Sequence, residues 1–181
     1  MFSVLSVAIR LGYMSILHLR KVLAASPVNL PAEGLIVRQF KVPDDIASWL
    51  NLRERAVAGL TPEPRAWLHD DFRREMLDKP WWDVERNWLA FQQNAPNVPI
   101  GAVTLAVREG EAARAAVVHW LLVDPAWRRR GVGRLLMLHL ERAAWDAGWR
   151  EVQLETHAGW SAAVAFYQSI GYELVRERAS R

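Results

Sequence analysis

Hydrophobic and polar positions recur along this chain at two periods, and these periods predict its elements. Stretches with the alternation and β-branched residues typical of strands lie at 35–40, 88–92, 151–156 and 172–176. Long apolar runs at 100–108 and 115–123 flank a loop at Gly110 and predict an antiparallel hairpin. Apolar residues at helical spacing predict helices at 46–52, 65–78, 135–147 and 161–169. The predicted order from residue 35 is therefore β-αα-βββ-α-β-α-β.

Punctuating residues support these boundaries. Asp44 or Asp45 is expected to cap the helix that begins at residue 46. Gly148 follows the long helix and Gly171 follows the last one, which is the usual place for glycine at a helix end. No repeat stands out, and the pattern predicts a single domain over residues 35–178.

Residues 1–34 differ from the rest because they are apolar-rich and carry Glu33 as their one acid. The longest charge-free run, residues 1–9, is far shorter than the roughly 20 residues of a membrane span. No charged segment precedes it, and 23–26 offers only a weak cleavage site for export. We expect an N-terminal extension that is helical or disordered. An over-predicted gene start and an amphipathic helix on the domain or on a membrane surface are the alternatives.

Composition narrows the chemistry. The chain has 181 residues, 51% of them hydrophobic, and no cysteine, which excludes disulfide scaffolds, cysteine zinc sites and cysteine nucleophiles. The histidines show no metal-ligand spacing, so no metal site is expected. The net charge is +3, but residues 126–150 hold six arginines against Glu141 and Asp146. One dense basic spot suits a small polyanion such as a nucleotide phosphate, whereas nucleic-acid binding usually needs a broader stripe.

The segment 123–134 carries the strongest chemical signal. Gly131 and Gly133 let backbone N–H groups approach a ligand without interference from a Cβ atom. The first N–H groups of the following helix lack intrahelical acceptors, and the helix dipole adds partial positive charge there. The segment therefore predicts an anion site that fits a pyrophosphate. It lacks the third glycine of a dinucleotide fingerprint and the Gly-Lys-Ser/Thr of a P-loop.

Two blocks of the sequence resemble the GNAT (GCN5-related) N-acetyltransferase family. They are Arg128-x-x-Gly131-x-Gly133 after Val123-x-Pro125, and Ala163-x-x-Phe166-Tyr167-x-x-x-Gly171-Tyr172. The front half, 37–83, is similar to the catalytic repeat of mycothiol synthases. The resemblance implies an α/β (α+β) fold: a GNAT-like mixed twisted sheet of six to seven strands with helices on both faces. The strands before and after the basic segment are expected to diverge.

The resemblance also implies roles for individual residues. Backbone groups of Leu121 and Val123 would contact the pantetheine of acetyl-CoA, and an N–H near Leu121 would stabilise the oxyanion. Tyr167 would protonate the leaving thiolate as general acid, with a packed core tyrosine as the alternative. The implied cofactor-binding residues are Leu121, Leu122, Val123, Arg128, Arg129, Arg130, Gly131, Val132, Gly133 and Arg134.

The sequence departs from the family pattern at two positions. The catalytic glutamate common in the family is missing near Val117, and Trp160 replaces an asparagine commonly found seven residues before the tyrosine. His119 lies two residues after Val117, on the same strand face, and is a candidate general base, with a satisfied histidine as the alternative. Glu155 is a second candidate base. The candidates for the acceptor groove are Trp81, Trp82, Glu155 and Trp160, with core packing as the alternative for the tryptophans.

The predicted function is acetyl transfer from acetyl-CoA to a primary amine by direct attack in a ternary complex. The acceptor would be a small-molecule amine or a protein amino group, and a mycothiol-type amino-sugar conjugate is one option. The alternative is a non-catalytic acyl-CoA-binding regulatory module of the same fold, which the missing glutamate motivates. We expect no nucleic-acid partner, no metal and no membrane span. We expect a cytoplasmic location. In the family the acceptor groove is often completed by a neighbouring subunit, so the resemblance also allows a homodimer.

Overall fold

The structure is a computed structural model that describes residues 15–28, 33–60, 64–109 and 114–179. Its strands are β1 (Ser15–Val22), β2 (Leu35–Gln39), β3 (Asn87–Gln92), β4 (Ala95–Glu109), β5 (Arg114–Val123), β6 (Glu151–His157) and β7 (Glu173–Ala179). Its helices are α2 (Ile46–Val57), α3 (His69–Phe72), α4 (Val132–Asp146) and α5 (Ser161–Ser169). Short π and 3-10 turns are η1 (Arg73–Leu77), η2 (Val84–Arg86) and η3 (Pro125–Trp127).

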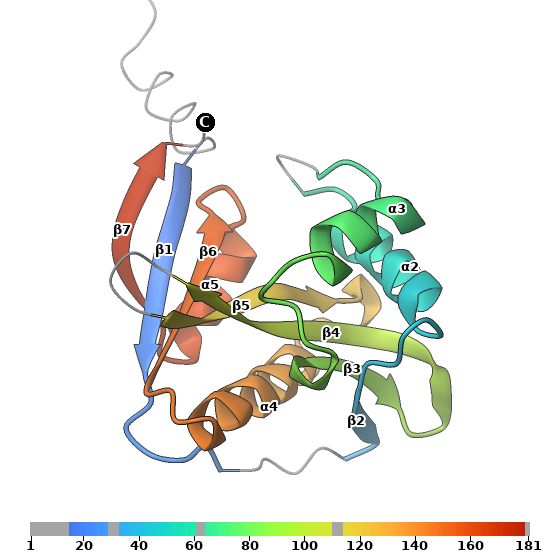
Figure 1. The fold of residues 1–181 in the computed structure, drawn as a ribbon, viewed down its shortest axis with the longest axis horizontal. Coiled ribbons are helices and arrows are strands. Elements are labelled where there is room, and N and C mark those ends of the chain that lie inside the picture. The colour runs from blue at the N-terminus through green and yellow to red at the C-terminus, as the bar shows by residue number, and fades with distance from the viewer. Residues whose placement is uncertain (1–14, 29–32, 61–63, 110–113, 180–181) are drawn as a thin grey trace, which may run out of the picture.

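The strands form one sheet of seven in the order β2-β3-β4-β5-β6-β1-β7 (Figure 1). Strands β5 and β6 run parallel, and the other neighbouring pairs are antiparallel. The predicted hairpin is β4–β5, in which Leu105 faces Val118. The predictions of a mixed sheet of six to seven strands and of this hairpin are confirmed.

Strand β1 corrects the expectation for the N-terminal region. It lies between β6 and β7 and pairs antiparallel with both, so residues 15–22 are neither helical nor disordered. Leu17 and Leu19 enter the core, whereas His18 and Arg20, at the alternate positions, lie on the opposite face of the strand. This alternation buries one face of the strand. In so short an apolar stretch, the sequence does not distinguish a strand from a helix. Residues 1–14 of the predicted extension lie outside the described part of the chain.

Helices cover both faces of the sheet, as predicted. Successive residues of β3 point to opposite faces, so Trp88 and Ala90 join the core under α4, whereas Leu89 and Phe91 join the core under α2. Helix α5 lies on the α4 face, where Phe166 contributes to the same core. No helix within the described ranges is long and apolar enough to cross a bilayer.

Local chemistry changes two predicted elements. The stretch 65–78 forms only the short α3 and η1, because the Asp71 carboxylate accepts the Leu68 N–H at 2.9 Å and sets the turn at residue 68. Asp45 precedes α2 but does not cap it with its side chain. Its carboxylate instead accepts the Lys41 N–H at 2.7 Å and two hydrogen bonds from Arg38 at 2.6 and 2.8 Å. The expectation of an aspartate side-chain cap on α2 is therefore wrong for Asp45.

Candidate active site

The sheet opens between β5 and β6. The two strands pair only at Ala116–Val152 and Val117–Gln153, although β5 continues to Val123 and β6 to His157. Beyond Val117, the edge of β5 that faces β6 therefore carries backbone N–H and C=O groups outside the ladder with β6. The predicted divergence of these strands is confirmed, and it leaves a split that runs toward the C-terminal end of β5 (Figure 1).

A bulge in β5 shapes one wall of this split. The register between β4 and β5 shifts so that Ala102 faces Leu122 but Thr104 faces His119. Trp120 takes a φ of +53°, in the left-handed region where a bulky residue costs energy. The bulge turns both His119 and Trp120 to the α2 side, where the two rings lie 5.5 Å apart. The backbone N–H of Leu121 follows this strained residue directly.

The basic turn lies at the end of β5. After η3, Arg129 has φ +61° and Gly131 has φ +82°, and α4 begins at Val132. The first hydrogen bond of α4 joins the Leu135 N–H to the Gly131 oxygen at 2.9 Å, so the N–H groups of residues 132–134 have no intrahelical acceptor. These groups and the positive end of the helix dipole make a site for an anion.

The arginines of this turn make different contacts. The Arg128 guanidinium donates to the Ala56 oxygen at the end of α2 at 2.7 Å, so it fastens α2 to the turn. Arg130 lies over the Trp127 ring at 5.0 Å. The side chains of Arg129 and Arg134 are exposed beside the helix start, where they can contribute positive charge to an anion.

Most of the other residues that the sequence predicts to bind the cofactor pack in the core or against it. Val132 is buried under the turn and Leu122 in the core under α2. Leu121 and Val123 pack on the α4 side. A Cβ atom on Gly133 would approach the Phe166 ring at 3.3 Å, so this glycine also permits α4 and α5 to come close.

Tyr167 projects from α5 into the core on the α4 side of the sheet, and 8% of it is exposed. Its ring lies 5.4 Å from Phe166 and 5.9 Å from Tyr172. Burial raises the pKa of the Tyr167 hydroxyl well above its usual range, so the group stays protonated at neutral pH. A protonated phenol can donate a proton to a basic leaving group.

The structure separates the predicted groove residues. Trp81 meets His119 at 4.6 Å between ring centroids and forms a wall on the α2 side of the split. Trp82 instead packs edge-on against Phe40 and Phe72, at 6.0 and 5.9 Å, as part of the core. Trp160 lies at the start of α5, 4.7 Å from the His157 ring.

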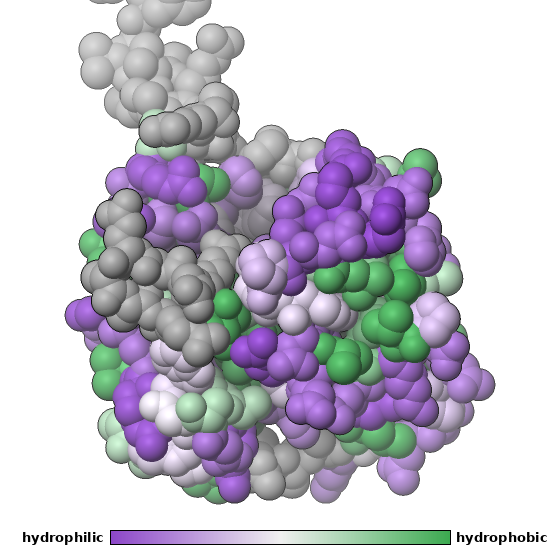
Figure 2. All heavy atoms as spheres, in the orientation of Figure 1, coloured by the Kyte–Doolittle hydropathy of each residue, from purple (hydrophilic) through white to green (hydrophobic). Residues whose placement is uncertain are grey.

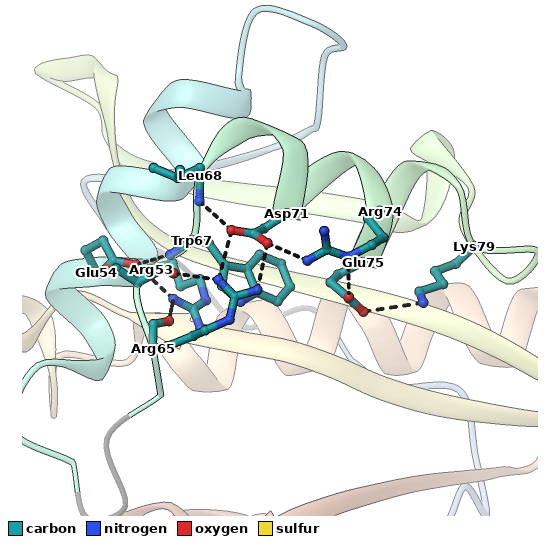
Figure 3. Close-up of polar contacts among 10 residues, drawn as sticks. Arg53, Glu54, Arg65, Trp67, Leu68, Asp71, Arg74, Glu75 and Lys79 are labelled. Carbon is teal, nitrogen blue, oxygen red and sulfur yellow. Dashed lines mark hydrogen bonds and ion pairs between the residues drawn. The ribbon is translucent and has the colours of Figure 1, made fainter.

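Arg53, which packs behind Trp120, was not singled out from the sequence. The Arg53 guanidinium is buried 4.5 Å from the Trp67 ring and 5.1 Å from the Trp120 ring. It donates to Glu54 at 2.8 Å and to the Arg65 oxygen at 3.0 Å (Figure 3). The signal was an arginine inside the apolar stripe of α2, four residues after Trp49.

A charged network fixes the segment that carries Trp67. Asp71 accepts two hydrogen bonds from Arg65 at 2.6 and 2.9 Å, and one from Arg74 (Figure 3). The bond from Arg65 is the main reason that the pKa of Asp71 lies well below its usual range. Hydrophilic side chains accordingly gather over α3 at the upper right of Figure 2.

Glu155 lies on the other side of the split. Its carboxylate approaches His18 Nδ1 on β1 at 3.3 Å and Arg178 on β7 at 3.1 Å. Neither His18 nor Arg178 was singled out from the sequence, because both come from strands far from Glu155 along the chain. Among the described residues, no group of three histidines, aspartates or glutamates is placed to hold a metal ion.

Comparisons with known proteins agree with this geometry. The sequence model of the acetyltransferase (GNAT) family matches residues 48–172. A mycothiol acetyltransferase of Kocuria rhizophila is 32% identical over 81% of this chain and 48% of its own length. A GCN5-related N-acetyltransferase of Sphaerobacter thermophilus has a similar structure, with a TM-score of 0.73 at 19% identity over 96% of this chain and 53% of its own.

An aminoglycoside N-acetyltransferase in complex with CoA also shares the fold. Its TM-score is 0.59 at 19% identity, over 81% of this chain and 90% of its own. This chain spans about half the length of the mycothiol acetyltransferases that it matches. Because the family model covers more than half of its residues, the chain belongs to the acetyltransferase (GNAT) family.

Proposed function

We propose that this chain transfers an acetyl group from acetyl-CoA to a primary amine by direct attack within a ternary complex. One observation carries the proposal: the split between β5 and β6 opens onto the basic turn, so that an unpaired strand edge and a helix N-terminus share one end of the sheet. An anionic pyrophosphate suits the turn, and the amide groups of pantetheine suit the free edge of β5. A CoA complex of a protein with this fold and the names of the relatives support acetyl-CoA as the donor.

The chemistry uses three groups of this chain. The amine nitrogen attacks the thioester carbonyl carbon, and the Leu121 N–H stabilises the oxyanion that forms. As the C–N bond forms and the C–S bond breaks, the leaving thiolate takes a proton from Tyr167. The amine loses its proton to His119, directly or through water. Tyr167 is protonated at neutral pH and so carries the proton that this step needs, although burial, which raises its pKa, also makes it a weaker acid than a tyrosine in water.

His119 replaces the missing glutamate in this proposal. Val117 is a buried valine and has no group that can accept a proton. His119 is partly exposed on the α2 side of the bulge. The rings of Trp81 and Trp120 flank it at 4.6 and 5.5 Å. Flat aromatic walls favour an acceptor with a ring or an apolar body. The acceptor of the mycothiol acetyltransferases is one compound to test, since those relatives match most of this chain.

The test combines cofactor binding with turnover. Acetyl-CoA at about 100 times its Kd should stabilise the folded protein by about 2.7 kcal/mol, which raises Tm by several degrees. An amine screen that follows release of the CoA thiol then separates an enzyme from a regulatory module. Stabilisation by acetyl-CoA without acetylation of any amine would favour the module, and no stabilisation would refute both.

A further inference from the structure

Four residues on the open side of β6, β1 and β7 form a polar cluster, which we call the Glu155 cluster: Glu155, His18, Arg176 and Arg178. The register pairs His18 with Glu155 on one side and with Arg176 on the other. Arg178 stands opposite Ile16, two positions along the same face. Figure 2 shows hydrophilic side chains at the upper left, over the ends of β7 and β1.

The cluster shares a face with the proposed base. The ladder between β5 and β6 ends at Val117–Gln153, and its continuation would place His119 next to Glu155. The two strands part instead, so His119 and Glu155 stand on opposite sides of the split. The core under α4 lies behind β6 and β1, where Leu154 and Leu19 point. Helix α2 covers this face over β4 and β5, whereas Glu155, Arg176 and Arg178 on β6 and β7 are exposed.

Hydrogen bonds fix the Glu155 carboxylate. Arg178 Nε donates to His18 Nε2 at 2.9 Å, so the proton of a neutral His18 sits on Nδ1, which faces Glu155 Oε1. Arg178 also donates to Glu155 Oε2 at 3.1 Å. Burial, reinforced by Arg176 and Arg178, lowers the pKa of His18 despite the opposing effect of Glu155. Both carboxylate oxygens are thus held in place by neighbours.

One positive charge of the cluster is left uncompensated. Glu155 balances Arg178, and His18 is neutral, whereas no described residue forms an ion pair or hydrogen bond with the Arg176 guanidinium. Arg20, further along the same face, differs because Glu151 pairs with it at 3.4 Å. A guanidinium on the same sheet face as the split, two strands from Glu155, is suited to a carboxylate or phosphate.

We infer that the acceptor is an amine that also carries an anionic group, with its nitrogen in the split between His119 and Glu155 and its anion at Arg176 and Arg178. The inference rests on the proposed function and names its class of acceptor. Glu155 and Arg176 are two strands apart, about 10 Å across the sheet. An acceptor whose nitrogen and anionic group lie several ångströms apart suits this distance.

The experiment compares aminohexanoate with aminohexanol, which differ only in the anionic group. A charge-assisted contact predicts that kcat/KM for aminohexanoate exceeds that for aminohexanol by about 10-fold or more. Arg176→Gln should reduce this ratio to within about 3-fold of unity by lowering kcat/KM for aminohexanoate alone. Arg20→Gln is the matched control, since it removes an arginine from the same face and should leave the ratio unchanged.

Direct binding separates failure of this inference from failure of the proposed function. Aminohexanoate and aminohexanol are titrated against the wild type and Arg176→Gln in the presence of CoA, with calorimetry as the readout. Binding that depends on both the carboxylate and Arg176 supports the acceptor class even if no amine is acetylated. Equal behaviour of the two amines in the wild type, or a preference that survives Arg176→Gln, overturns it.

Discussion

The basic turn and the acceptor side of the split are built in opposite ways. The turn is one contiguous segment that offers backbone N–H groups to an anion, and Gly131 with φ +82° permits its path. The acceptor side is assembled from side chains of separate segments, with Trp81 and His119 on one side and Glu155 on the other. The turn therefore depends on backbone conformation, whereas the acceptor side depends on tertiary packing.

Under the proposed function, the donor and acceptor sites would therefore be separable in this fold. A site made of main-chain groups tolerates changes of side chain as long as its glycines remain. A site made of side chains changes its chemistry with each substitution, and the sequence departs from the family pattern there, at Val117 and Trp160. Substitutions in the turn should weaken acetyl-CoA binding whatever the acceptor is. Substitutions of side chains across the split should alter only the choice of acceptor or the rate of transfer.

The largest effect is expected from Gly131→Glu. A non-glycine residue at φ +82° is strained, and a carboxylate at the helix start repels an anion. We expect the stabilisation by acetyl-CoA to disappear in thermal unfolding. Gly148→Glu is the matched control, because Gly148 at the other end of α4 has φ +88° and equally open space around its Cβ position. Similar loss of acetyl-CoA binding in both variants would contradict a local anion site.

The next largest effect is expected from Tyr167→Phe. Loss of the hydroxyl should lower kcat by about 100-fold or more while the affinity for acetyl-CoA stays the same. Tyr172→Phe is the control, since Tyr172 is also buried and its ring lies 5.9 Å away. Initial rates with saturating acetyl-CoA measure the first quantity, and thermal shifts measure the second. An unchanged kcat in Tyr167→Phe would remove the tyrosine from the mechanism.

The same contrast explains what the sequence could predict. The hairpin β4–β5, the helix α4 and the turn before it follow from local patterns, because apolar periodicity and glycine positions are encoded within a few residues. The split between β5 and β6 was expected only through the resemblance to a family. Its two-pair ladder depends on how strands distant in sequence meet.

The remaining features need tertiary contacts. An apolar stretch such as 15–22 suits a strand or a helix, and its place between β6 and β7 is decided by those strands. His18 and Arg178 became visible only when that pairing brought them to Glu155. Trp82 could not be distinguished from Trp81 in the sequence, since adjacent aromatic residues look alike until tertiary contacts place one against Phe40 and Phe72 and the other against His119.

A smaller effect is expected from His119→Gln, which keeps the size and polarity of the side chain but removes the proposed proton acceptor. We expect kcat to fall by about 10- to 100-fold, less than for Tyr167→Phe, because bulk water can also accept the proton. The loss should shrink as pH rises, since more of the amine is then already neutral. His69→Gln, on the exposed start of α3, provides the control. Rates that match the wild type across the pH range would exclude His119 as the base.

The smallest effect on activity is expected from Asp45→Asn, which tests how the acceptor side is held rather than what it does. Burial alone would raise the pKa of Asp45, but the hydrogen bonds from Arg38 and the Lys41 N–H outweigh it and lower the pKa. A carboxyl whose folded pKa lies below its unfolded value, roughly 3.9, contributes its full stability above that pH. The contribution is lost as pH falls through the folded pKa.

Asp45→Asn should therefore lower the free energy of unfolding by about 1–3 kcal/mol at pH 7 and make it less sensitive to pH below about 4. Turnover at pH 7 should stay close to that of the wild type, since Asp45 lies beside the start of α2 and away from the split. Denaturant unfolding at a series of pH values measures the slope, with the exposed neighbour variant Asp44→Asn as the control. If the free energy of unfolding changes equally with pH in Asp45→Asn and in the wild type, the hydrogen bonds between Asp45 and Arg38 do not stabilise the fold. The acceptor side, like the turn, would then be held mainly by its hydrophobic core.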